Sequence, residues 1–118
     1  MDEYPSVDKR LRSALLPFGY DVEKGVYRGA NPTYFVFGYN TIPAQPSDDT
    51  PEFERYLIWV RIVAPVTVKI TELVRQVKRA LESADFAFPQ ETMVDNADQQ
   101  EILLETEWAE QIGAEADV

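Results

Sequence analysis

The sequence predicts an α+β fold: a mainly antiparallel, mixed sheet of about four strands with two helices packed on it, in a single domain over residues 1–118. Stretches with a side-chain period of two, which marks half-buried strands, follow one another along the chain. Two other stretches have apolar residues at helical spacing. Because neighbouring strands form hairpins, we expect antiparallel pairing with the helices on one face of the sheet.

The first third of the chain predicts a helix, an irregular segment and a strand. Apolar residues at helical spacing form a stripe over 6–16, and a proline and a glycine then end the helix. Residues 21–29 form an extended segment or a hairpin-like turn around Gly25. The stretch TYFVFGYNT is aromatic and β-branched, so it predicts a strand over 33–41 that lies well inside the sheet.

A long loop separates this strand from a second central strand. The segment 42–54 contains three prolines and two adjacent aspartates, Asp48 and Asp49, and has no periodicity. Its length is near the upper end for a compact domain, and it is either a binding element or a tolerated insertion. Alternation resumes in RYLIWVRIVA, which predicts a strand over 55–64.

The second half predicts a long helix and two further strands. Apolar residues at i, i+3, i+4 and i+7 form one stripe over 68–84. A weaker strand over 86–94 contains Pro89, which restricts it to an edge or entry position. The last strand, over 101–109, alternates apolar and acidic residues, and we expect the tail 111–118 to be frayed.

Charge is distributed unevenly along the chain. The net charge is −10: residues 1–81 have 10 acids and 11 bases, whereas residues 82–118 have 11 acids and no base. The acidic part lacks the Lys and Arg clusters that bind nucleic acid through its phosphates. The acidic part could repel nucleic acid, imitate it or bind a basic partner, or it could simply form a solvated acidic surface.

The sequence offers little catalytic or metal-binding chemistry. It has no His and no Cys, and its five glycines never cluster, so the usual bases, thiol nucleophiles, metal ligands and phosphate cradles are missing. Carboxylate pairs at Asp48 and Asp49 or at Glu105 and Glu107 are formal candidates for acid–base work, but solvated acids are the simpler interpretation. We expect no enzyme, no cofactor and no metal.

No stretch suggests a membrane span or a secretion signal. There is no apolar run near the ~18 residues that cross a bilayer, and the start MDEYPSVDKR lacks a basic region followed by an apolar one. Together with the missing cysteines, this favours a cytosolic protein.

The two arginines of the strand 55–64, Arg55 and Arg61, share one face. We expect this face to lie across from the acidic face of the last strand. Pairs with Glu105 and Glu107 would then offset the repulsion between neighbouring glutamates. Two arginines do not offset the whole acidic excess, so an uncompensated acidic surface remains to be explained.

Two further groups have two interpretations each. Trp59 and Trp108 are interface anchors or, as we favour, residues that pack in the core or on the second face of the sheet. Arg75, Lys78 and Arg79 form a basic patch for an acidic partner or, because glutamates lie three or four residues away, a self-neutralised solvated face, which we favour.

The order of the elements resembles a known family. The chain runs through LRSALLPFGYDVEKGVY, an aromatic region YFVFGYNTIPAQPSDDTPEFERYLIWVRIVAP, a helix that ends in a phenylalanine–proline stretch, ITELVRQVKRALESADFAFP, and a closing ILLETEW. Over about residues 8–110 this resembles the small tail terminator (tail completion, head–tail joining) proteins of long-tailed bacteriophages and prophages. The resemblance lies in the order, lengths and aromatic positions, without any catalytic signature.

The resemblance implies a structural protein of the virion tail or neck, assembled in the host cytoplasm. Such subunits form a ring, often a hexamer, which caps the tail tube, contacts the head connector and lets DNA pass without specific binding. The loop 42–54 and the exposed sheet edge would serve as subunit contacts, and an acidic lumen would repel phosphate. The candidate interface or lumen residues are Asp48, Asp49, Arg55, Arg61, Glu101, Glu105 and Glu107.

The acidic last third is not required by that family pattern and keeps an alternative open. The alternative is a small acidic protein that imitates DNA, or an adaptor protein, in which the acidic residues bind a basic partner. Mimics carry carboxylates over much of their surface, whereas here the acids lie in one third of the chain, which favours assembly. A third interpretation, a ligand-binding ferredoxin-like domain, requires a concave polar pocket.

Overall fold

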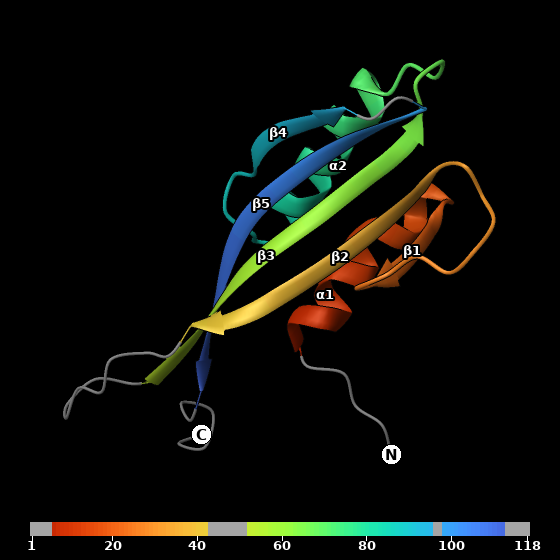
Figure 1. Ribbon diagram of the computed structural model, residues 1–118. Coiled ribbons are helices and arrows are strands. Elements are labelled where there is room, and N and C mark those ends of the chain that lie inside the picture. Colours follow the sequence, from red (N-terminus) through yellow and green to blue (C-terminus); the bar gives the residue numbers. More distant parts are fainter. Residues whose placement is uncertain (1–5, 43–51, 96–97, 113–118) are drawn as a thin grey trace.

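The computed structural model confirms the α+β fold class and describes residues 6–42, 52–95 and 98–112. For residues 52–54, 95 and 110–112 it describes the backbone alone. The five strands form one mixed sheet in the order β1-β2-β3-β5-β4 (Figure 1). β1 pairs with β2 in parallel, and all other neighbours are antiparallel. In chain order the elements are α1 (Ser6–Leu15), the short 3-10 helix η1 (Leu16–Phe18), β1 (Asp21–Lys24), β2 (Tyr34–Ile42), β3 (Glu52–Pro65), α2 (Thr71–Ser83), β4 (Gln90–Asp95) and β5 (Gln99–Ile112).

Both α-helices lie on the same face of the sheet (Figure 1). Alternate residues of β3, such as Ile58, Val60 and Ile62, are at most 2% exposed and pack against the apolar stripes of the helices. Val77 and Leu81 of α2 are fully buried in the same cluster. Removal of this apolar surface from water is the main stabilising contribution, at roughly 25 cal/mol per Å².

Within the described residues, no helix covers the opposite face of the sheet, which we name the open face (Figure 1). It consists of the other alternate positions of the central strands. In β3 these are Arg55, Leu57, Trp59, Arg61 and Val63, and in β5 they are Glu101, Leu103, Glu105, Glu107 and Ala109.

The segment 21–29 differs from its expected structure. It contains a fifth strand, β1, which is parallel to β2 and therefore not part of a hairpin. Gly25 ends β1 with a φ of +85°, a left-handed conformation that suits glycine. Its N–H donates to the Phe37 carbonyl oxygen at 2.8 Å, and the following loop returns the chain to the start of β2.

The boundaries of the later strands also differ from expectation. The predicted loop 42–54 is shorter, because Ile42 still belongs to β2 and residues 52–54 already belong to β3; residues 43–51 lie outside the described part. In the predicted tail 111–118, Gln111 and Ile112 pair with the start of β3, and the remainder lies outside the described part. The backbones of β3 and β5 remain paired beyond the point where apolar and polar side chains stop alternating. The sequence pattern therefore placed the start of β3 too late and the end of β5 too early.

The predicted strand 86–94 begins only at Gln90. The chain first turns at Asp85, whose φ is +76°, and then places Phe86 in the core, where it is 4% exposed. The apolar stretch around Phe86 therefore closes the end of α2 and does not start the strand.

Candidate functional site on the open face

Two cross-strand ion pairs lie on the open face. Arg55 Nη2 is 2.6 Å from Glu107 Oε1, and Arg61 Nε is 3.1 Å from Glu101 Oε2. Both arginines are about half exposed in their side chains, so each pair contributes about 0–1 kcal/mol to stability. Their main effect is to lower the net negative charge of this face.

The partner of Arg61 differs from the expected one. The register places Arg61 opposite Leu103, so Glu101 and Glu105 lie two positions away on either side. Glu105 is directly opposite Trp59, and the Arg61 guanidinium lies over the Trp59 ring, 5.2 Å from its centre. Arg61 therefore pairs with Glu101, and Glu105 forms no ion pair with any residue that the structure describes.

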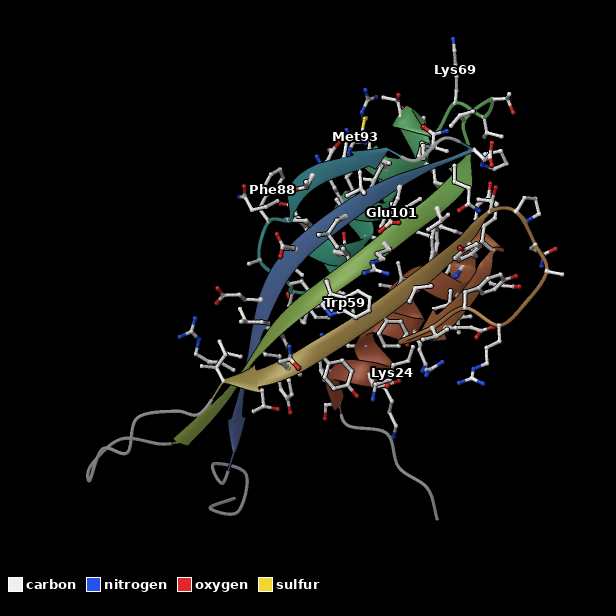
Figure 2. The ribbon with its side chains drawn as sticks, in the orientation of Figure 1. Lys24, Trp59, Lys69, Phe88, Met93 and Glu101 are labelled. Atoms are coloured by element: carbon white, nitrogen blue, oxygen red, sulfur yellow. The ribbon has the colours of Figure 1, made fainter. Side chains whose placement is uncertain are left out.

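Trp59 lies at the centre of the open face, next to β2. Figure 2 shows Trp59 and Glu101 on the side of the sheet away from the helices. Trp59 is half-buried because its indole covers Gly38, the residue directly opposite in β2. A Cβ at Gly38 would lie 2.1 Å from Cζ2 of Trp59, so only glycine leaves room for the indole. Trp59 thus packs on the second face of the sheet.

Trp108 lies on the other face, toward the helices. Its ring is 6.0 Å from that of Tyr56 and 6.1 Å from that of Phe86, and the Arg10 guanidinium lies 4.8 Å from its centre. Trp108 is therefore a partly buried residue at the margin of the core.

A second cluster, at the β1 edge of the sheet, was not expected from the sequence. The Tyr27 hydroxyl donates to Asp21 Oδ2 at 2.6 Å, and Asn31 Nδ2 donates to the same oxygen at 2.9 Å. These hydrogen bonds lower the pKa of Asp21, whereas partial burial and the bond to Asp21 raise the pKa of Tyr27. The Tyr27 ring also stacks on Tyr34 at 3.8 Å, so the loop after β1 is fixed in place.

Two of the three basic residues of α2 are paired with acids, as the favoured interpretation predicts, whereas Arg79 forms no ion pair with any described residue. Arg75 Nη1 is 2.9 Å from Glu72, and Lys78 Nζ is 2.5 Å from Glu91 of β4. The second of these partners comes from another element, so the sequence spacing did not indicate it.

The structure thus brings five of the predicted site residues together on the open face: Arg55, Arg61, Glu101, Glu105 and Glu107. Asp48 and Asp49 lie outside the described residues. Within the described residues, no group of three or more acidic side chains is placed to hold a metal ion, and no helix is long and apolar enough to span a membrane.

Comparisons with known proteins identify structural relatives only. No family model and no curated protein matches the chain. A solved structure of a protein without a functional name has a TM-score of 0.58 at 9% identity, over 86% of this chain and 90% of that one. A chain from the virion of a native gene transfer agent (GTA) particle has a TM-score of 0.47 at 17% identity, over 82% and 81% of the two chains. The first similarity shows a shared fold, and the second is too distant to carry an argument.

Proposed function

We propose that this chain is a structural subunit of a phage or phage-like particle, namely a tail terminator or head–tail joining protein that forms a ring on the tail tube. One observation carries the proposal: the chain has the architecture that the family resemblance implies, with helices on one face of a mainly antiparallel sheet. The partners would be further copies of the chain, the tail tube and the head connector, and the site of action would be the neck of the virion.

The open face supports a role in assembly. Leu57 on this face is 46% exposed, and Trp59 and Leu103 are half-buried. Charged residues surround these three side chains. Aromatic residues and arginines are enriched at protein interfaces, where apolar groups lie within a polar rim.

The proposed role needs no catalytic step. The carboxylates of Glu105 and Glu107, the described pair that the sequence offers for acid–base work, do not act as a pair, because Glu107 is bound to Arg55. The open face is therefore better suited to binding another protein surface than to acid–base catalysis.

On the ring model, DNA passes through the lumen without specific binding. Arg61 and Arg55 neutralise Glu101 and Glu107, so Glu105 is the unpaired acid that the described part of this face would present to phosphate. The electrostatic role of the three glutamates is thus smaller than their sequence positions suggest.

The ion pairs also favour assembly over imitation of DNA. A mimic presents free carboxylates in place of phosphates. Here six acidic residues are held by basic ones: Asp8, Glu72, Asp85, Glu91, Glu101 and Glu107.

Electron microscopy of the purified protein mixed with tail tubes of its particle tests this function. We expect ring-shaped density at one end of each tube and co-sedimentation of protein with tubes. Binding to a basic, DNA-binding protein without any binding to tubes would refute the proposal and support the mimic.

A further inference from the structure

The two edge strands of the sheet, β1 and β4, lie at the same level. Within the described residues they form its opposite edges (Figure 1). One row of directly paired residues runs across β2, β3 and β5 from Val22 to Met93, and another runs from Lys24 to Glu91. The four residues of β1 are therefore level with residues 91–94 of β4.

The two edge strands also run in opposite directions. β1 is parallel to β2, and each of the three remaining pairs in the sheet is antiparallel. A closed ring of identical subunits is generated by a rotation without any shift along its axis. Where this axis runs along the strands, the rotation preserves both the level and the direction of each strand. The β4 edge of one copy then meets the β1 edge of the next copy in antiparallel orientation.

The side chains that meet in this arrangement are complementary. Val22 faces Met93, and Lys24 faces Glu91, on the helix side of the sheet. The first pair is apolar, and the second joins opposite charges. Directly opposed pairs of opposite charge stabilise antiparallel strands, whereas like charges in these positions destabilise them.

Both charges are accessible to a neighbouring copy. Lys24 is exposed, donates a hydrogen bond to the Tyr39 hydroxyl at 3.2 Å and forms no ion pair with any described residue. Glu91 binds Lys78 of its own chain, but its side chain is still 38% exposed. A carboxylate has several acceptor sites, so Glu91 can bind a second cation.

The β4 edge also has the apolar character of a contact surface. Phe88, Met93 and Val94 are 60%, 60% and 38% exposed. Figure 2 shows Phe88 and Met93 along β4, on the opposite side of the sheet from Lys24. Exposed apolar groups gathered in this way indicate a binding surface, and an edge strand favours pairing with a further strand.

The loop after β1 is anchored on the open face. The Tyr27 hydroxyl donates to Asp21, and the Arg28 backbone N–H donates to Glu23 at 3.2 Å. Asp21 and Glu23 alternate with Val22 and therefore point away from the helices. Within the described residues, no backbone group of this loop bonds to Val22. The loop thus leaves the helix side of β1 to a neighbouring copy.

We propose that β4 of one copy of the chain binds β1 of the next copy as an antiparallel strand, so that the sheet continues from subunit to subunit. A two-fold contact between two β4 edges is opposed by charge, because residues 82–112 contain no base and acidic surfaces would meet. The inference rests on the ring of the proposed function and names the strands that form it.

Disulfide trapping tests the contact directly, because the chain has no cysteine of its own. The variants Lys24→Cys and Glu91→Cys are mixed in equal amounts and oxidised. The control mixture pairs Lys24→Cys with Thr92→Cys, the next residue of β4, which is also exposed but points to the opposite face. We expect at least ~10-fold more mixed disulfide in the first mixture, because the paired strands raise the effective concentration of the two thiols.

Three outcomes of the trapping experiment would overturn the inference. Equal yields in the two mixtures would mean that the strands are not in register, and no mixed disulfide in either would mean that they do not meet. A disulfide between two Glu91→Cys chains in excess of the mixed one would show a two-fold contact between β4 edges instead.

A charge exchange checks the predicted pair. Lys24→Glu and Glu91→Lys should each raise the dissociation constant for self-association by ~5-fold or more, since like charges would then lie opposite one another. The double variant should restore association. Arg79→Glu serves as the control, because Arg79 is exposed on α2 and forms no ion pair with any described residue, and it should leave the constant unchanged. Loss without restoration, or an equal effect of the control, would contradict the pairing.

These results separate the contact from the function. Trapping needs only the purified protein, so a specific disulfide without binding to tail tubes would keep the contact and reject the tail-end role. Binding to tubes without a specific disulfide would do the reverse.

Discussion

The fit of Trp59 over Gly38 predicts a measurable cost for adding one methyl group. In Gly38→Ala the new Cβ would lie 2.1 Å from Cζ2 and 2.5 Å from Cε2 of the indole, so the ring must move off β2. Overpacking of this kind costs about 1–3 kcal/mol. Alanine also lowers the conformational entropy of the unfolded chain, which offsets about 0.4–1 kcal/mol of this loss in stability. We expect a net loss of about 1–2 kcal/mol in the free energy of unfolding.

A double-mutant cycle isolates the contact. Urea unfolding followed by circular dichroism is measured for Gly38→Ala, Trp59→Leu and the double variant, which avoids relying on tryptophan fluorescence. In the Trp59→Leu background the same alanine should be neutral or stabilising, because the clash is gone. A stabilising Gly38→Ala in the natural chain, or an unchanged cost without the indole, would refute the packing argument.

Three further predictions concern the core and the edge of the sheet. Val77→Asp should lower the free energy of unfolding by ~3–5 kcal/mol, and by more than Trp59→Ala, because Val77 is fully buried; unchanged urea unfolding would show that α2 faces another way. Asp8→Ala should cost about 2–4 kcal/mol, since Asp8 is fully buried and accepts a hydrogen bond from the Tyr39 hydroxyl; a loss under about 0.5 kcal/mol, the range of an ordinary surface substitution, would contradict this. Asp21 has a lowered pKa in the folded chain, so its contribution is present above the ordinary value of 3.8 and is lost as the pH falls through the folded value. Asp21→Asn should therefore flatten the acid side of the stability profile, and identical profiles would speak against the hydrogen-bond network.

The helices and central strands were predictable because their patterns are long. The stripe that contains Val77 and Leu81 spans several helical turns, and both residues are fully buried. The alternation through Ile58 and Val60 likewise identified the core face of β3. Burial of one face determines such elements, and the sequence records that burial directly.

The edges of the sheet were not predictable in the same way. β1 has four residues, too few for periodicity, and its parallel pairing depends on the loop that Tyr27 and Asp21 hold in place. At the other edge, Phe86 looked like part of a strand but fills the core. In both cases tertiary contacts decide the local structure.

The candidate site was predictable as a face but not as a set of contacts. The period of two placed Arg55, Arg61 and the glutamates together. Arg61 pairs with Glu101 and not with Glu105 because of the register between β3 and β5 and the position of Trp59. The hollow of about 430 Å³ between the first turns of α2 and the strands β4 and β5 depends on how these elements pack, which no single stretch of sequence specifies.

The mass of the purified chain in solution, measured by light scattering over a range of concentration and salt and repeated with tail tubes present, tests the ring most directly. The account predicts a closed multimer, expected as a hexamer, whose mass stays constant over a range of concentration and whose assembly weakens at high salt. A chain that stays monomeric alone and also binds tubes as single copies, or not at all, would contradict it.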